Sequence, residues 1–168
     1  MKKSYLAIIA IVVIGAITVY AISPYFTEST INEALPEGVI TPLEKEDASS
    51  TINDVMMEKA IPGSYSGTFF GPGDGIHEAE GDAFTVLLED GSKVLRLENF
   101  KTTNGPDLFV YLSTDENASD FINLGVLKAN IGNQNYEIPN DANLEKYNKV
   151  LIWCKSFSVL FGSAELSS

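Results

Sequence analysis

The chain has 168 residues and a formal net charge of −12 at pH 7. After Pro24 the imbalance reaches −14, because 23 acidic residues face only 9 basic ones once Lys2 and Lys3 are left behind. A surface this acidic argues against nucleic acid and anionic lipid as partners, and the single cysteine cannot form a disulfide within the chain.

A hydrophobic, uncharged run covers residues 5–22, directly after Lys2 and Lys3. It is long enough to cross a bilayer and exceeds the hydrophobic part of most signal peptides, which favours a retained anchor over residues 1–23. Val19-Tyr20-Ala21 also resembles a cleavage site, and cleavage there would release a secreted protein. Because positive charge stays inside, the remainder is predicted to lie outside the cytoplasm on a single-pass anchor in the cell membrane.

An acidic segment rich in Ser, Thr, Glu and Pro follows over residues 24–62, and this composition predicts a stalk. One part of it has helical periodicity. Ile52, Val55 and Met56 recur at helical spacing, and Pro62 closes the segment. A short helix is therefore expected near residues 51–61.

Short β-rich runs alternate with turn residues over 63–168, which predicts an all-β domain, either an antiparallel sandwich or a barrel-like sheet. Asp90-Gly91 is a strong hairpin signal between two of these runs. Pro106 begins another run, at a position where the missing N–H is tolerated. The expected strands are 64–70, 77–88, 93–100, 107–113, 122–128, 133–138, 147–155 and 157–166.

Four segments of this domain carry a family resemblance: GTFFGPGDGIHEAEGDA, LENFKTTNGPDLFVYLS, LGVLKANIGNQNYEIP and YNKVLIWCKSFSVLFGSAEL. In this order and spacing, over about residues 63–166, they resemble the DM13 domain family. The resemblance implies an extracytoplasmic all-β module, often found beside DOMON and cytochrome b561 domains, with a cysteine proposed to take part in electron transfer. It would make Cys154 that cysteine and His77 the N-terminal histidine of the family. The hydrophobic run holds no histidine for a membrane haem, so an electron partner would be another protein.

The environment expected for Cys154 follows from strand alternation. Cys154 shares one face with Val150 and Ile152, while Lys155 points to the other face and is a poor candidate for lowering the thiol pKa. Two interpretations stay open, an inert cysteine at the margin of the core and a redox-active thiol.

His77 is the only histidine, and the small residues that share its strand face leave room for a ligand or a packed aromatic ring. It either packs on the core or assists Cys154. A blue-copper site needs two histidines and is excluded. A metal ion held by Cys154, His77 and a carboxylate remains open, as does haem ligated by one of the two, although no haem-attachment motif is present.

Glu78, Glu80 and Asp82 form a row of carboxylates on the opposite strand face. Their spacing does not match an EF-hand loop, so a solvated face is the expected interpretation.

The sequence therefore predicts a membrane-anchored redox or electron-transfer accessory module that acts through Cys154, with His77 as its assistant. The alternatives are a non-catalytic extracellular binding or adhesion module, with Cys154 packed in the core, and a metal-binding domain. One histidine and no nucleophile-elbow pattern give little support for hydrolysis, so a stand-alone enzyme is not expected.

Overall fold

The structure, a computed structural model, describes residues 11–15, 28–40 and 64–168. These residues contain eight strands. They are β1 (Ser66–Phe70), β2 (Ala79–Leu87), β3 (Lys93–Thr102), β4 (Leu108–Ser113), β5 (Phe121–Val126), β6 (Gln134–Ile138), β7 (Lys149–Cys154) and β8 (Val159–Glu165). Each overlaps one of the eight predicted strands, with ends that differ by at most two residues, so the prediction of an all-β domain is confirmed.

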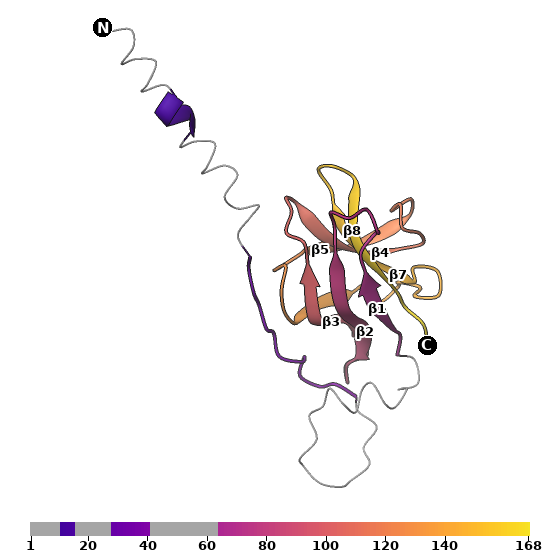
Figure 1. The fold of residues 1–168 in the computed structure, drawn as a ribbon. Coiled ribbons are helices and arrows are strands. Elements are labelled where there is room, and N and C mark those ends of the chain that lie inside the picture. The colour runs from indigo at the N-terminus through magenta and orange to yellow at the C-terminus, as the bar shows by residue number, and fades with distance from the viewer. Residues whose placement is uncertain (1–10, 16–27, 41–63) are drawn as a thin grey trace, which may run out of the picture.

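The strands form one sheet in the order β5-β4-β7-β8-β1-β2-β3-β6, and neighbouring strands are antiparallel. β1 joins the two halves of this sheet: its first three residues pair with β2, and Phe69 and Phe70 pair with β8. The outermost strands β5 and β6 contact each other. The sheet is therefore a nearly closed barrel (Figure 1), which decides between the two predicted architectures.

The barrel interior is filled by alternate residues of the central strands, as the twofold periodicity of a strand requires. Phe69 and Phe100 meet edge to face inside it, with ring centroids 5.1 Å apart. The buried set includes Leu95 and Leu97 of β3, Val110 and Leu112 of β4, and Val150 and Ile152 of β7. Truncating such a side chain to alanine typically costs about 2–5 kcal/mol, so this core can hold the fold without a disulfide.

Residues 28–40, called the N-terminal strap below, lie on the outside of the barrel (Figure 1). The backbone of Ile31 donates to the carbonyl of Ile131 at 3.0 Å, near the start of the strap. Near its end, the backbone of Ile40 donates to the carbonyl of Leu87 at 3.0 Å. Part of the segment predicted as a stalk is thus hydrogen-bonded along the barrel wall.

The strap covers a polar pair on the outer face of β3. Arg96 is 3% exposed, and its Nε donates to Glu98 at 2.6 Å. One Nη1 hydrogen bond goes to the carbonyl of Glu33 at 2.8 Å and another to the side chain of Asn135 at 3.0 Å. Sequence alternation cannot reveal this burial, because the covering residues come from more than sixty positions earlier.

At the N-terminus, residues 11–15 are helical, and the side chains of Ile11, Val12, Val13 and Ile14 are exposed. Within the described ranges, no helix is both long and apolar enough to cross a membrane. Most of the predicted anchor at 1–23 and all of the helix predicted near 51–61 lie outside the described residues.

Candidate functional site

The loop between β1 and β2 is organised around the carboxylate of Asp74. Oδ1 of Asp74 accepts hydrogen bonds from the backbone N–H groups of Ile76 at 2.9 Å and His77 at 2.8 Å. Gly73 and Gly75, on either side, have φ values of +76° and +74°, which glycine adopts without a steric penalty. The glycine-rich approach to His77 is therefore a defined turn that carries the carboxylate to the histidine.

Asp74 also orients the imidazole of His77. Its Oδ2 lies 2.5 Å from Nδ1 of His77. The backbone N–H of His77, the His77 ring and the N–H of Ile76 lower the pKa of Asp74 to about 2, so this carboxylate is ionised near neutrality. An ionised carboxylate only accepts hydrogen bonds, so Nδ1 carries the proton and Nε2 is the nitrogen left for a ligand or a proton.

The ring of His77 packs against Phe161 of β8, with centroids 4.1 Å apart and planes inclined by 49°. Phe161 in turn packs against Gly105 in the turn between β3 and β4. A Cβ on Gly105 would lie 2.5 Å from Cζ of Phe161, so only glycine fits beneath that ring. Phe161 thus joins the histidine loop to the Asn104–Asp107 turn.

The same turn holds the thiol of Cys154. Cys154 ends β7 and is 1% exposed, within the core cluster that also contains Val150 and Ile152. Its Sγ donates to the carbonyl oxygen of Pro106 at 3.1 Å. Loss of the proton would set a thiolate against that carbonyl oxygen, so the observed geometry suits the neutral thiol.

The turn after β7 differs from its predicted form. The strand was expected to run to residue 155, but it ends at Cys154. In the turn that follows, Ser156 donates to the carboxylate of Asp107 at 2.7 Å, and Ser158 has a φ of +53°. Lys155 Nζ lies 5.2 Å from the ring centroid of Phe109, and is thus directed away from the thiol, as alternation predicted.

His77 and Cys154 therefore lie at one end of the barrel, but they are not hydrogen-bonded to each other; Phe161 and the Asn104–Asp107 turn link them. Among the residues that the structure describes, no group of three or more His, Cys, Asp and Glu side chains could hold a metal ion. The described residues thus do not assemble the three-ligand site of Cys154, His77 and a carboxylate.

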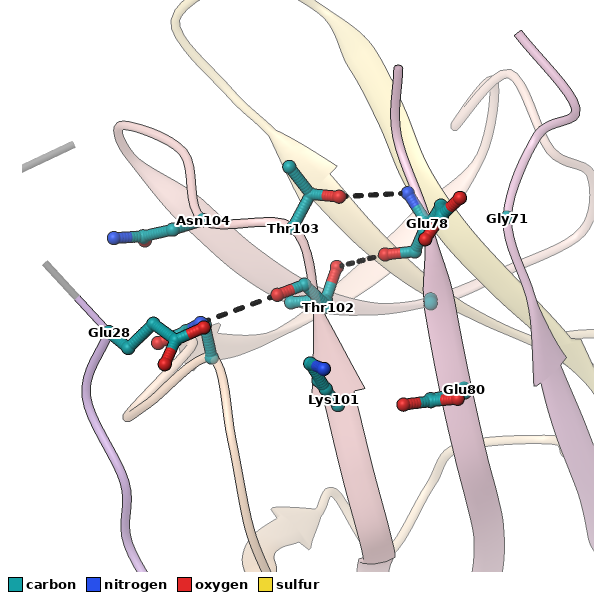
Figure 2. A pocket seen from close by; sticks show the side chains of 10 residues that line it. Glu28, Gly71, Glu78, Glu80, Lys101, Thr102, Thr103 and Asn104 are labelled. Carbon is teal, nitrogen blue, oxygen red and sulfur yellow. Dashed lines mark hydrogen bonds between the residues drawn. The ribbon is translucent and has the colours of Figure 1, made fainter. Parts of the chain in front are cut away.

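A groove of about 690 Å³, lined mostly by polar residues, opens beside this end (Figure 2). Its wall is fixed by hydrogen bonds from the backbone N–H of Glu78 to the Thr103 hydroxyl at 3.0 Å and from the Thr102 hydroxyl to the carbonyl of Glu78 at 3.0 Å. Glu78 and Glu80 are exposed along the groove, whereas Asp82 accepts a hydrogen bond from Thr68 at 2.9 Å. These positions agree with the solvated face predicted for the carboxylate row.

A family model described as electron transfer DM13 matches residues 71–166, more than half of the chain. The chain belongs to the DM13 family. Neither the search of curated proteins nor the search of solved structures found a match.

In this DM13 domain the matched segments meet in space at one end of the barrel, which sequence reasoning only partly anticipated. It singled out His77 and Cys154 but missed Phe161, which reads as one more apolar strand residue. It did not connect Asp74 with His77. The available signal was the position of Asp74 three residues before the only histidine, between two glycines that permit a tight turn.

Proposed function

We propose that this DM13 protein is a single-pass, membrane-anchored electron-transfer module of the extracytoplasmic side, with Cys154 as its redox-active group and His77 as a positioning residue. The observation that supports this most is the convergence of the family-matched segments on one sulfur. In the turn at residues 104–107, the carbonyl of Pro106 accepts a hydrogen bond from the Cys154 thiol, and Phe161 connects that turn to His77.

Burial restricts how Cys154 could react. Thiol–disulfide exchange needs a partner sulfur to reach the attacked atom, and a thiol that is 1% exposed does not allow this. In the proposed step, the thiol loses one electron to an oxidised metal or haem centre of a partner protein and one proton to water, leaving a thiyl radical. Return of both restores the thiol. His77 and the turn keep the surrounding atoms packed while the electron crosses them.

The test is a redox titration of the full-length protein with hexachloroiridate, a one-electron oxidant too large to enter the core. Wild type should consume one more electron equivalent than Cys154→Ser, and electron paramagnetic resonance of a freeze-quenched sample should report a sulfur-centred radical only in wild type. Tyrosine and tryptophan oxidation is common to both proteins and cancels in the difference. Equal consumption by the two proteins would rule out Cys154 as the carrier.

The anchor and the location belong to the same proposal. They are supported by the length of the hydrophobic run at residues 5–22, by Lys2 and Lys3 before it, and by the helical conformation of residues 11–15. A reporter fused after Ser168 should be active only outside the cytoplasm. The mass of the mature chain separates an anchored protein from one cleaved after Ala21 and secreted.

A second candidate is a binding or adhesion module in which Cys154 serves packing alone. The observation that favours it is the combination of 1% exposure with a thiol already hydrogen-bonded to Pro106, which a structural cysteine would share. Equal oxidant consumption by wild type and Cys154→Ser would favour this candidate. The groove lined by Glu78, Thr103 and Asn104 would then be the first surface to examine for a ligand.

A further inference from the structure

Three large apolar side chains stand exposed at the barrel end that carries His77 and Cys154. Phe70 is 68% exposed, Ile76 71% and Phe157 69%. They belong to the end of β1, the loop before β2 and the turn between β7 and β8. Since β1 and β7 end where β2 and β8 begin, the strand register puts all three at the same end, the upper one in Figure 1. Isolated exposed apolar residues are ordinary, but a group on neighbouring loops marks an interaction surface.

The chain reaches the barrel at this same end. Glu28, the first residue of the strap, lines the groove together with Glu78 and Thr103 (Figure 2). The strap then runs to the opposite end, where Val39 pairs with Leu88 beside the β2–β3 hairpin. The strap therefore begins at the end that carries the three apolar side chains.

Chain length limits how far this end can lie from the hydrophobic run. That run ends at residue 22, and six residue steps lead from there to Glu28. A polypeptide spans at most about 3.6 Å per residue, so the connection reaches no more than ~20 Å in any conformation. β3, with ten residues, is roughly 30 Å long at the usual rise of a strand. If the opposite end of the barrel faced the bilayer, Glu28 would lie farther from the membrane than the six-residue connection can span.

We propose that the loops carrying Phe70, Ile76 and Phe157 dock on the outer surface of the bilayer that holds the anchor, so that the His77 and Cys154 end of the barrel faces the membrane. This inference rests on the proposed anchor. Large apolar side chains on protruding loops suit the boundary between headgroups and acyl chains. Asp74 and Glu78 lie on the same end and would be repelled by anionic lipid, so the surface that fits is zwitterionic phospholipid.

The test uses full-length protein in discs of phosphatidylcholine with brominated acyl chains, which quench tryptophan only at short range. The single native tryptophan is removed by Trp153→Phe, and one reporter is added. Phe157→Trp puts the reporter on the proposed surface. Phe121→Trp is the matched control, because Phe121 is also exposed but begins β5 opposite Ser113, at the far end of the barrel. The Phe157→Trp protein should be quenched several-fold more strongly than the Phe121→Trp protein.

The outcomes separate docking from anchoring. Protein that does not co-purify with the discs contradicts the anchor, and docking falls with it. If both proteins are held in the discs but their reporters are quenched equally, or not at all, docking on lipid is overturned while the anchor stands. The three apolar side chains would then face another membrane-held protein. Adding Phe70→Ser and Ile76→Ser to the Phe157→Trp protein should lower the quenching. Unchanged quenching would contradict the proposal that Phe70 and Ile76 contact the lipid.

Discussion

Two regions of this molecule use polar side chains in different ways: the strap over Arg96 and Glu98, and the loop that carries Asp74 and His77. Under the strap, Arg96 and Glu98 are 3% and 5% exposed, and the guanidinium bonds to the strap, to β3 and to β6. In the loop between β1 and β2, the side chains of His77 and Asp74 remain 19% and 37% exposed, and the hydrogen bonds of Asp74 stay within one turn. The first arrangement ties distant segments together, whereas the second orients a single ring.

This difference teaches where stability and function can be changed separately. Breaking a buried, hydrogen-bonded ion pair leaves a charge in a poorly solvated place and is costly, whereas water replaces much of what an exposed pair loses. Substitutions at the strap should therefore alter unfolding strongly, and substitutions in the histidine loop should alter the site with little effect on unfolding.

The largest effect is expected for Arg96→Ala, which removes the guanidinium from the buried carboxylate of Glu98. Breaking a buried pair in this way typically costs about 3–5 kcal/mol of unfolding free energy, to be measured by urea denaturation. Lys149→Ala is the control, because its partner Glu165 is 66% exposed, and it should change the midpoint little. Equal shifts in the two variants would remove the contrast between a buried and an exposed ion pair.

Gly105→Ala should come next, because the new Cβ would lie 2.5 Å from the ring of Phe161. Overpacking of this kind typically costs about 1–3 kcal/mol. The ring of Phe161 must move, so the NMR signals of the His77 ring should shift as well. Adding Phe161→Leu should recover part of the loss, since two contacting residues are not additive. Additive losses would mean that Gly105 is required for another reason.

Glu33→Ala tests the strap from its own side. Glu33 forms an ion pair with Lys128 at 2.7 Å and accepts the backbone N–H of Asn135 at 2.7 Å. Loss of such hydrogen bonds is expected to cost about 1 kcal/mol, again from urea denaturation. The exposed Glu37, in the same strap, provides a matched Glu37→Ala control that should behave as wild type. A strap that contributes nothing would give the same midpoint for both.

The smallest effect is expected for Asp74→Asn and appears only in acid. The pKa of Asp74 is lowered from an ordinary value of 3.8 to about 2, so its contribution to stability is present above about pH 4 and is lost as the pH falls toward 2. Thermal melts of wild type should decline over that interval, and Asp74→Asn should lack this part of the decline. Parallel acid limbs would show that the hydrogen bonds of Asp74 do not matter for folding.

The strands were predictable because each combines β-rich composition with turn residues at its ends, as Asp90-Gly91 does between β2 and β3. The burial of Arg96 was not predictable. A charged residue between Leu95 and Leu97 is expected to face solvent, and no local pattern indicates that residues 28–40 cover it.

At the site, residue counting identified His77 and Cys154 because each is the only one of its kind. Their arrangement depends on contacts across distant strands: Phe161 lies 84 positions after His77, and Pro106 lies 48 before Cys154. Periodicity carries no information about such pairs. The partner of His77 could have been read from the short spacing to Asp74, since the hydrogen bond is local.

β1 has a consequence for how the domain can be cut. It lies before residue 71, where the family match begins, yet it is the strand that joins β2 to β8. A fragment that starts at the family boundary would lose this strand. The edges of β2 and β8 would then be unpaired, each exposing a row of backbone donors and acceptors. Such edges pair readily with other chains, so the shortened piece should exchange strands or aggregate more readily than a piece that includes β1.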